Sequence, residues 1–138
     1  MIYLTRCYRF SAAHVLAHPE LDASENRRIF GKCANPGGHG HDYQVEVSVT
    51  GPIDPETGQM IRPGLLDEVF QEVVETRFAH RMLNEVEPFQ KIVPTAENIS
   101  EVCHGLLDEA ISQRSTARLA HLRIIETEQN FVDQGELS

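Results

Sequence analysis

Two segments with the alternation of β-strands carry histidines at their facing ends, and this feature limits the fold more than any other. The first segment runs from Tyr3 to Ala13 and is followed directly by His14. The second, residues 43–49, alternates apolar with polar side chains and comes just after His39 and His41. Such alternation is typical of strands that bury one face. If the two strands pair, all three histidines meet at one end of a sheet.

The three histidines have the spacing and chemistry of a metal site. Alternate side chains of an extended segment point to the same side, so His39 and His41 present two imidazoles to one cation. Neutral imidazole is a good ligand for Zn²⁺, and a catalytic zinc usually takes three protein ligands and leaves a position for water or substrate. The ordinary alternative is a pair of surface histidines, but the Asn-Pro-Gly-Gly turn at 35–38 favours a shaped site. We therefore predict a Zn²⁺ site made by His14, His39 and His41.

The cysteines divide into one functional candidate and two structural ones. Cys33 is either a fourth ligand, which closes the site, or a free thiol beside an open site, where it can act as a base or nucleophile. The sequence leaves both readings open. Cys7 and Cys103 are predicted to be small core residues. Three cysteines with no Cys-x-x-Cys pair do not suggest a disulfide framework, and we expect a cytoplasmic protein.

The chain of 138 residues, with 41% apolar content, is predicted to form one domain over residues 1–138. Helical periodicity favours helices near 65–79 and at 96–113, the second with Thr95 as its N-cap. We expect strands at 2–13, 43–51, 59–62 and 117–126, an irregular loop to about 42, and no strong signal over 132–138. This order predicts an α+β fold, an antiparallel sheet of about four strands with two helices on one face.

Charge and hydropathy exclude two classes of partner. The formal net charge of −9 argues against a nucleic-acid surface, which needs clustered basic groups. The sequence has no apolar run long enough to span a membrane, and its first residues do not have a signal-peptide pattern. We expect neither nucleic acid nor membrane as a partner.

Several blocks of the sequence resemble the signature motifs of the 6-pyruvoyl tetrahydropterin synthase family. The match runs in order over nearly the whole chain. Five residues separate Cys33 from His39, as in the biopterin-pathway branch, whereas the 6-carboxytetrahydropterin synthases of queuosine synthesis typically have three. The matching blocks are Phe10-Ser11-Ala12-Ala13-His14, Glu25-Asn26, Phe30-Gly31-Lys32-Cys33, His39-Gly40-His41-x-Tyr43, Ile53-Asp54-Pro55-x-Thr57-Gly58, His80-x-x-Leu83-Asn84, Pro94-Thr95-Ala96-Glu97-Asn98 and Glu126-Thr127-x-x-Asn130.

The resemblance implies a zinc-dependent lyase that acts on a small pterin, 7,8-dihydroneopterin triphosphate, and eliminates triphosphate. It implies that the three histidines hold Zn²⁺, that Cys33 moves protons on the substrate side chain with His80 as its relay, and that Glu126 grips the pterin. Thr95 and Glu97 match residues that line the same pocket. The implied architecture is the tunnelling fold, an oligomeric barrel assembled as a trimer or hexamer, in which His80 and Glu126 serve a neighbouring chain's zinc.

Two acids of the family pattern are missing. Ala79 stands where the family usually has an aspartate that orients the relay histidine. Leu65 stands where relatives commonly have another, and Asp67 is a candidate to replace it. These departures keep three alternatives open: 6-carboxytetrahydropterin formation or side-chain cleavage on the same scaffold, a pterin-binding protein that has lost catalysis, and a purely structural zinc protein.

Basic residues just before Cys33 are the candidates for the triphosphate. Arg28 and Lys32 are predicted to bind it, with Arg27 in the same patch. The alternative is an ordinary solvated turn.

Overall fold

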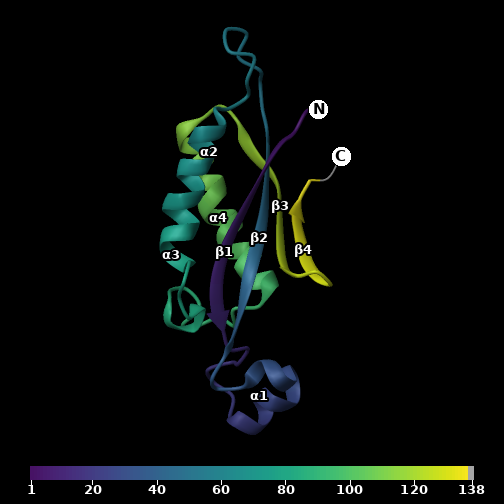
Figure 1. The fold of residues 1–138 in the computed structure, drawn as a ribbon, viewed down its shortest axis with the longest axis vertical. Coiled ribbons are helices and arrows are strands. Elements are labelled where there is room, and N and C mark those ends of the chain that lie inside the picture. Colours follow the sequence, from purple (N-terminus) through teal and green to yellow (C-terminus); the bar gives the residue numbers. More distant parts are fainter. Residues whose placement is uncertain (137–138) are drawn as a thin grey trace.

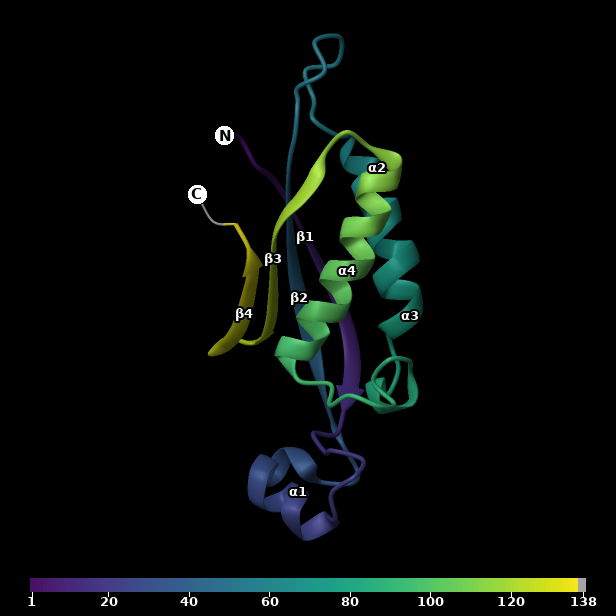
Figure 2. The same ribbon diagram turned by 180° about the vertical axis from the view of Figure 1, so that it is seen from behind.

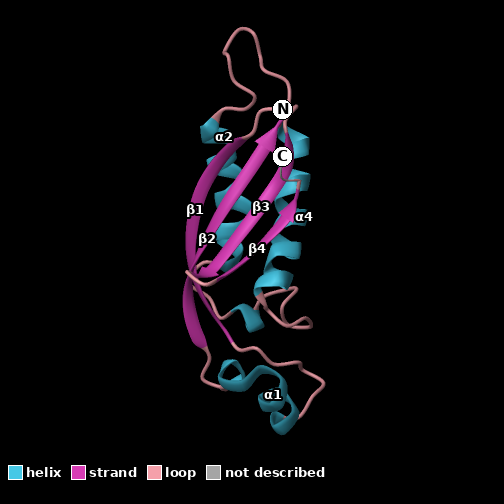
Figure 3. Ribbon diagram, turned by 90° about the vertical axis from the view of Figure 1, so that its right-hand side faces the viewer, coloured by secondary structure: helices cyan, strands magenta, loops and turns pink. Residues whose placement is uncertain are grey.

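A computed structural model describes residues 1–136 and contains one antiparallel sheet with helices packed on one face (Figure 1). The strand order is β1-β2-β3-β4, and each strand pairs with the next along the chain. Figure 3 shows the sheet from the face that carries no helices. The strands are β1 Leu4–His14, β2 His39–Thr50, β3 Arg118–Thr127 and β4 Asn130–Gly135. The predicted α+β class and the four-stranded antiparallel sheet are confirmed.

Strand alternation places the core between the sheet and two long helical segments. Tyr43, Val45 and Val47 on β2 are fully buried, while the residues between them are more exposed. The first helical segment combines α2 Pro63–Phe70, a π-helical turn η2 Gln71–Glu75 and α3 Thr76–Phe78; the second is α4 Ala96–Arg114. Figure 2 shows both segments side by side over the sheet. Apolar burial on the facing surfaces is the main force holding the two layers together.

The helix ends follow the expected local rules. The Thr95 hydroxyl accepts a hydrogen bond from the Asn98 amide at 3.2 Å, so the predicted N-cap of α4 is confirmed. Proline occupies the first position of α2, where its missing N–H costs nothing. Ala79 leaves the helical conformation, with φ −65° and ψ 135°, and ends the first segment.

Four features of the secondary structure differ from the sequence-based expectations. Residues 59–62 form no strand; the loop that contains them has only local turn bonds, from the Asp54 amide to the Gln59 carbonyl and from the Gly58 amide to Asp54. The fourth strand is instead β4, which covers the first part of the tail that had no strong signal. The expected irregular loop contains a helix, α1 Ala23–Phe30, followed by a 3-10 turn, η1 Gly31–Ala34. Finally, β2 begins at His39, so both of its histidines are strand residues.

The two structural cysteines differ in burial. Cys103 on α4 is completely buried, as predicted, and burial raises the pKa of its thiol to about 12. Cys7 is exposed, and its assignment to the core was wrong, because the alternation of β1 turns it to the helix-free face of the sheet. Among the described residues, none of the helices is both long enough and apolar enough to cross a bilayer.

Candidate metal centre and active site

The three histidines of the predicted metal site meet at one end of the sheet. His14 is the last residue of β1 and lies opposite His39, the first residue of β2, while His41 lies opposite Ala12. One ligand atom from each histidine lies within 4.8 Å of the other two, and the Nε2 atoms of His14 and His39 are 2.9 Å apart. Zinc–nitrogen bonds of about 2.0–2.1 Å place tetrahedral ligand nitrogens about 3.3 Å apart. The cluster therefore fits a single metal ion with small movements of the rings.

The neighbours of His14 fix its orientation and protonation. Its ring is fully buried, and Nδ1 lies 2.8 Å from the Pro94 carbonyl oxygen and 3.2 Å from the Tyr43 hydroxyl. An Nδ1–H that donates to Pro94 leaves the Nε2 lone pair directed at the cluster, as in most histidine metal ligands. Burial lowers the pKa of His14 and of His41, so both favour the neutral form that binds metals.

Glu126 lies beside the histidines of its own chain. Its Oε2 is 4.0 Å from His14 Nε2, and the Asn130 side-chain amide donates to its Oε1 at 3.1 Å. The side chain is only 15% exposed, whereas a glutamate near the end of a strand is usually solvent-facing. Glu126 thus needs no neighbouring chain to reach the metal site, unlike the arrangement that the resemblance implied.

Cys33 lies outside the group of ligand atoms. Within residues 1–136, the cluster close enough to share one ion contains the three histidines alone. Cys33 is in η1 and half-buried, and its carbonyl accepts a hydrogen bond from the Leu16 amide at 2.8 Å. Of the two readings that the sequence left open, the geometry favours a three-ligand site with Cys33 as a free thiol outside it.

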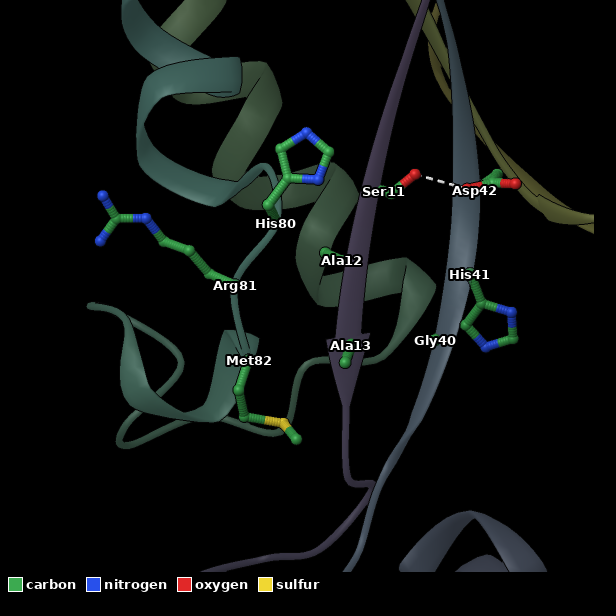
Figure 4. Close-up of a pocket in the computed structure, with 9 residues that line it drawn as sticks. All are labelled: Ser11, Ala12, Ala13, Gly40, His41, Asp42, His80, Arg81 and Met82. Atoms are coloured by element: carbon green, nitrogen blue, oxygen red, sulfur yellow. Dashed lines mark hydrogen bonds between the residues drawn. The ribbon is translucent and has the colours of Figure 1, made fainter.

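His80 is held at the outer edge of β1. Its amide donates to the Ser11 carbonyl at 2.6 Å, and the Ala13 amide donates to the Arg81 carbonyl at 2.9 Å. These bonds fix His80 at φ 61°, a left-handed conformation that is uncommon for residues other than glycine. Figure 4 shows the rings of His80 and His41 on opposite sides of the β1–β2 pair. Within one chain, His80 therefore points away from the metal site.

Asp42 is a site-lining residue that sequence reasoning missed. A pocket of about 440 Å³ extends along β1 and β2 between His80 and His41, and Asp42 is the one carboxylate that borders it (Figure 4). The Ser11 hydroxyl donates to Asp42. In the sequence, Asp42 has the appearance of an ordinary outward-facing strand residue, and only the pairing of Ser11 with Asp42 across the two strands gives it a place in the pocket.

Asp67 does not replace the acid missing at Leu65. Its carboxylate accepts two hydrogen bonds from Arg6, at 2.7 and 3.1 Å, and one from the Tyr8 hydroxyl at 2.6 Å. Both partners are residues of β1 and precede His14 by at least six positions along the strand. Hydrogen bonds from Arg6 and Tyr8 hold the pKa of Asp67 below its usual value.

The remaining predicted site residues are scattered. Thr95 follows Pro94, whose carbonyl contacts His14, so it lies next to the cluster; Glu97 is exposed on the first turn of α4. Arg28 forms an ion pair with Glu25, at 2.8 Å, within α1. Lys32 lines a separate pocket with Arg27.

Known proteins share the sequence pattern and the fold of this chain. A model of the 6-pyruvoyl tetrahydropterin synthase family matches residues 3–136. The 6-pyruvoyl tetrahydrobiopterin synthase of Poecilia reticulata is 39% identical over 132 residues, which cover 94% of this chain and 87% of the relative. The human protein of that name is 35% identical over 130 residues, covering 94% and 88%. The solved structure of Caenorhabditis elegans 6-pyruvoyl tetrahydropterin synthase superposes with a TM-score of 0.89 at 33% identity, covering 99% of this chain and 96% of that one. The chain belongs to the 6-pyruvoyl tetrahydropterin synthase family.

Proposed function

We propose that this chain is a zinc-dependent lyase that converts 7,8-dihydroneopterin triphosphate to 6-pyruvoyl tetrahydropterin and releases triphosphate. The observation that carries the proposal is the convergence of three imidazoles at one end of the sheet with the Glu126 carboxylate beside them. A purely structural zinc site needs four ligands, and the cluster has three. Membership of the family supports the same reaction.

His14, His39 and His41 would hold the ion at the end of the sheet. When bound, Zn²⁺ supplies Lewis acidity that makes the neighbouring C–H bonds easier to deprotonate. The lowered pKa values of His14 and His41 suit this role, because a neutral imidazole needs no deprotonation before it binds the metal.

The other residues bind the pterin and move protons. Glu126 accepts hydrogen bonds from the N–H groups of the amino-pyrimidine edge, and Thr95 and Glu97 border the same space. The Cys33 thiolate takes a proton from a side-chain carbon, and the C–O bond to triphosphate breaks with its electron pair leaving on the triphosphate. His80 exchanges that proton with Cys33 of a second copy, since its ring points away from the histidine cluster of its own chain.

This division of roles requires an oligomer. We propose a trimer or hexamer in the cytoplasm, in which each copy of the chain folds as one domain and the open edges of neighbouring sheets pair. Pairing would remove the unpaired N–H and C=O groups of β4 and of the part of β1 before Ser11, because β1 and β4 are the edge strands.

Incubation with 7,8-dihydroneopterin triphosphate tests the proposal. The zinc-loaded protein should release triphosphate and yield a pterin with the mass of 6-pyruvoyl tetrahydropterin, and Cys33→Ala should do neither. A product with fewer carbon atoms would instead assign the chain to 6-carboxytetrahydropterin formation or side-chain cleavage. Saturable pterin binding without turnover would contradict the lyase and leave a binding protein.

A further inference from the structure

A basic pocket lies in the segment between β1 and β2 that also contains Cys33. It has a volume of about 470 Å³ and is bordered by Arg27, Gly31, Lys32 and Asn35, with no acidic residue. Arg27 and Lys32 are both exposed, and over residues 1–136 neither is in an ion pair. On a chain with a net charge of −9, two cations without acidic partners mark a local site for an anion.

The neighbouring arginine has a different environment. Arg28 donates through Nε and Nη2 to one oxygen of Glu25, at 3.2 and 2.8 Å. Successive residues of a helix point about 100° apart, so Arg27 and Arg28 face different directions from α1. The pairing with Glu25 neutralises Arg28 and leaves the charge of Arg27 directed at the pocket.

The backbone connects this pocket to the active site. Gly31 has φ +60°, a conformation that favours glycine, and it turns the chain from α1 into η1. Lys32 and Cys33 are adjacent in η1, and the Cys33 carbonyl is tied to the Leu16 amide, two residues beyond His14. Figures 1 and 3 show α1 projecting from the end of the sheet where β1 ends and β2 begins. The cations therefore lie on α1 and on the turn that contains Cys33, at the end of the sheet where β1 ends and β2 begins.

Taking the proposed lyase as its basis, we infer that Arg27 and Lys32 bind the triphosphate group of the substrate, and that Arg28 does not. A guanidinium binds phosphate oxygens in a bidentate fork, and an ammonium adds a compact charge. The Asn35 side-chain oxygen accepts from the Gly37 amide at 3.3 Å, which leaves its NH₂ group as a further donor to the pocket. The same groups hold the triphosphate as it leaves.

Two ligands that differ only in phosphate test this site. Calorimetry with 7,8-dihydroneopterin triphosphate and with 7,8-dihydroneopterin, both in the zinc-loaded Cys33→Ala background, gives the contribution of the triphosphate as the ratio of the two Kd values. We expect Arg27→Ala and Lys32→Ala each to weaken binding of the triphosphate ligand about tenfold, since hydrogen bonds to charged groups are worth this much. Affinity for the phosphate-free ligand should not change. Arg28→Ala is the matched control and should leave both affinities unchanged, and Arg27→Lys should recover part of the loss.

Steady-state kinetics, measured in protein that retains Cys33, separates this inference from the proposed lyase. Arg27→Ala should raise KM for the triphosphate substrate with little effect on kcat, because the lost contact is made in both ground and transition states. If the protein turns over but the ratio of the two Kd values is unchanged in Arg27→Ala and Lys32→Ala, the pocket does not bind the triphosphate, and the proposed lyase still stands. If the variants lose the affinity gained from the triphosphate but the unmodified protein shows no turnover, the pocket assignment stands and the proposed lyase is refuted. An equal loss in Arg28→Ala would show a general charge effect and refute the assignment.

Discussion

Alanine at position 79, in place of the family's usual aspartate, allows a quantitative prediction of how a carboxylate beside His80 would change kcat. Ala79 is half-buried and has φ −65° and ψ 135°, a conformation that aspartate adopts without strain. Ala79→Asp would put a carboxylate next to the relay imidazole, where it favours the charged ring and fixes its orientation. The size of the gain depends on how well His80 is shielded from water.

The expected rise in kcat for Ala79→Asp has two limits that are far apart. His80 is exposed in the single chain, and exposed ion pairs contribute about 0.2–1 kcal/mol, or at most about fivefold in rate. If a second copy covers His80, the carboxylate and the imidazolium about 4 Å apart interact by up to about 4 kcal/mol at an effective dielectric constant of about 20. This corresponds to a rate about 10³-fold higher. Because the proposed relay acts across an interface, we expect kcat to rise by more than about tenfold.

Steady-state release of triphosphate measures the effect. Ala79→Asn is the matched control, because it has the same shape without the charge, and its kcat should stay close to that of the unmodified chain. A rise of less than about twofold in Ala79→Asp, or an equal rise in Ala79→Asn, would refute the idea that His80 acts as a charged relay in a covered site.

Three further predictions concern the fold and the metal site. Leu122→Ala removes a fully buried side chain of β3 and should lower the free energy of unfolding by about 2–5 kcal/mol in urea titrations, and a loss below about 1 kcal/mol would contradict its core position. Hydrogen bonds from Arg6 lower the pKa of Asp67 in the folded state, so the ionised carboxylate stabilises the fold above its unfolded pKa, and this stability is lost as pH falls through the folded pKa. Asp67→Asn should therefore lower the free energy of unfolding at about pH 7 but not in strong acid. A loss of stability that does not vary with pH would argue against this. Gly38→Ala should weaken zinc binding about tenfold or more, since its φ is +73° and the new Cβ would lie 3.2 Å from the backbone carbonyl oxygen of the ligand His14. Gly58→Ala, at the same φ in open space, should leave the zinc Kd unchanged.

The parts of the fold that the sequence predicts are those with strong periodicity. β2 alternates over most of its length, and α4 combines an N-cap with an apolar stripe, so β2 was found from Tyr43 onward and α4 nearly in full. The sequence did not predict β4, because Val132 and Gln134 are only half-buried and its other residues are exposed. The two faces of the strand therefore differ little in hydrophobicity. α1 escaped because it buries a single polar residue, Asn26, and so has no apolar stripe.

The same distinction holds for the site. The convergence of His14, His39 and His41 follows from the period of a strand and from one pairing, which a sequence can indicate. The choice between Arg27 and Arg28 depends on which side chain Glu25 captures, a tertiary detail that adjacent arginines do not reveal. The place of Asp42 in the pocket depends in the same way on the pairing of β1 with β2.

A zinc titration of the metal-free protein, followed by the rate of triphosphate release, tests the central claim most directly. The account predicts a rate that rises in proportion to added zinc and stops rising at one equivalent per chain, while His41→Ala stays inactive at every concentration. Full activity in the metal-free protein, or full activity in zinc-loaded His41→Ala, would contradict the assignment of the three histidines as the metal centre of a pterin lyase.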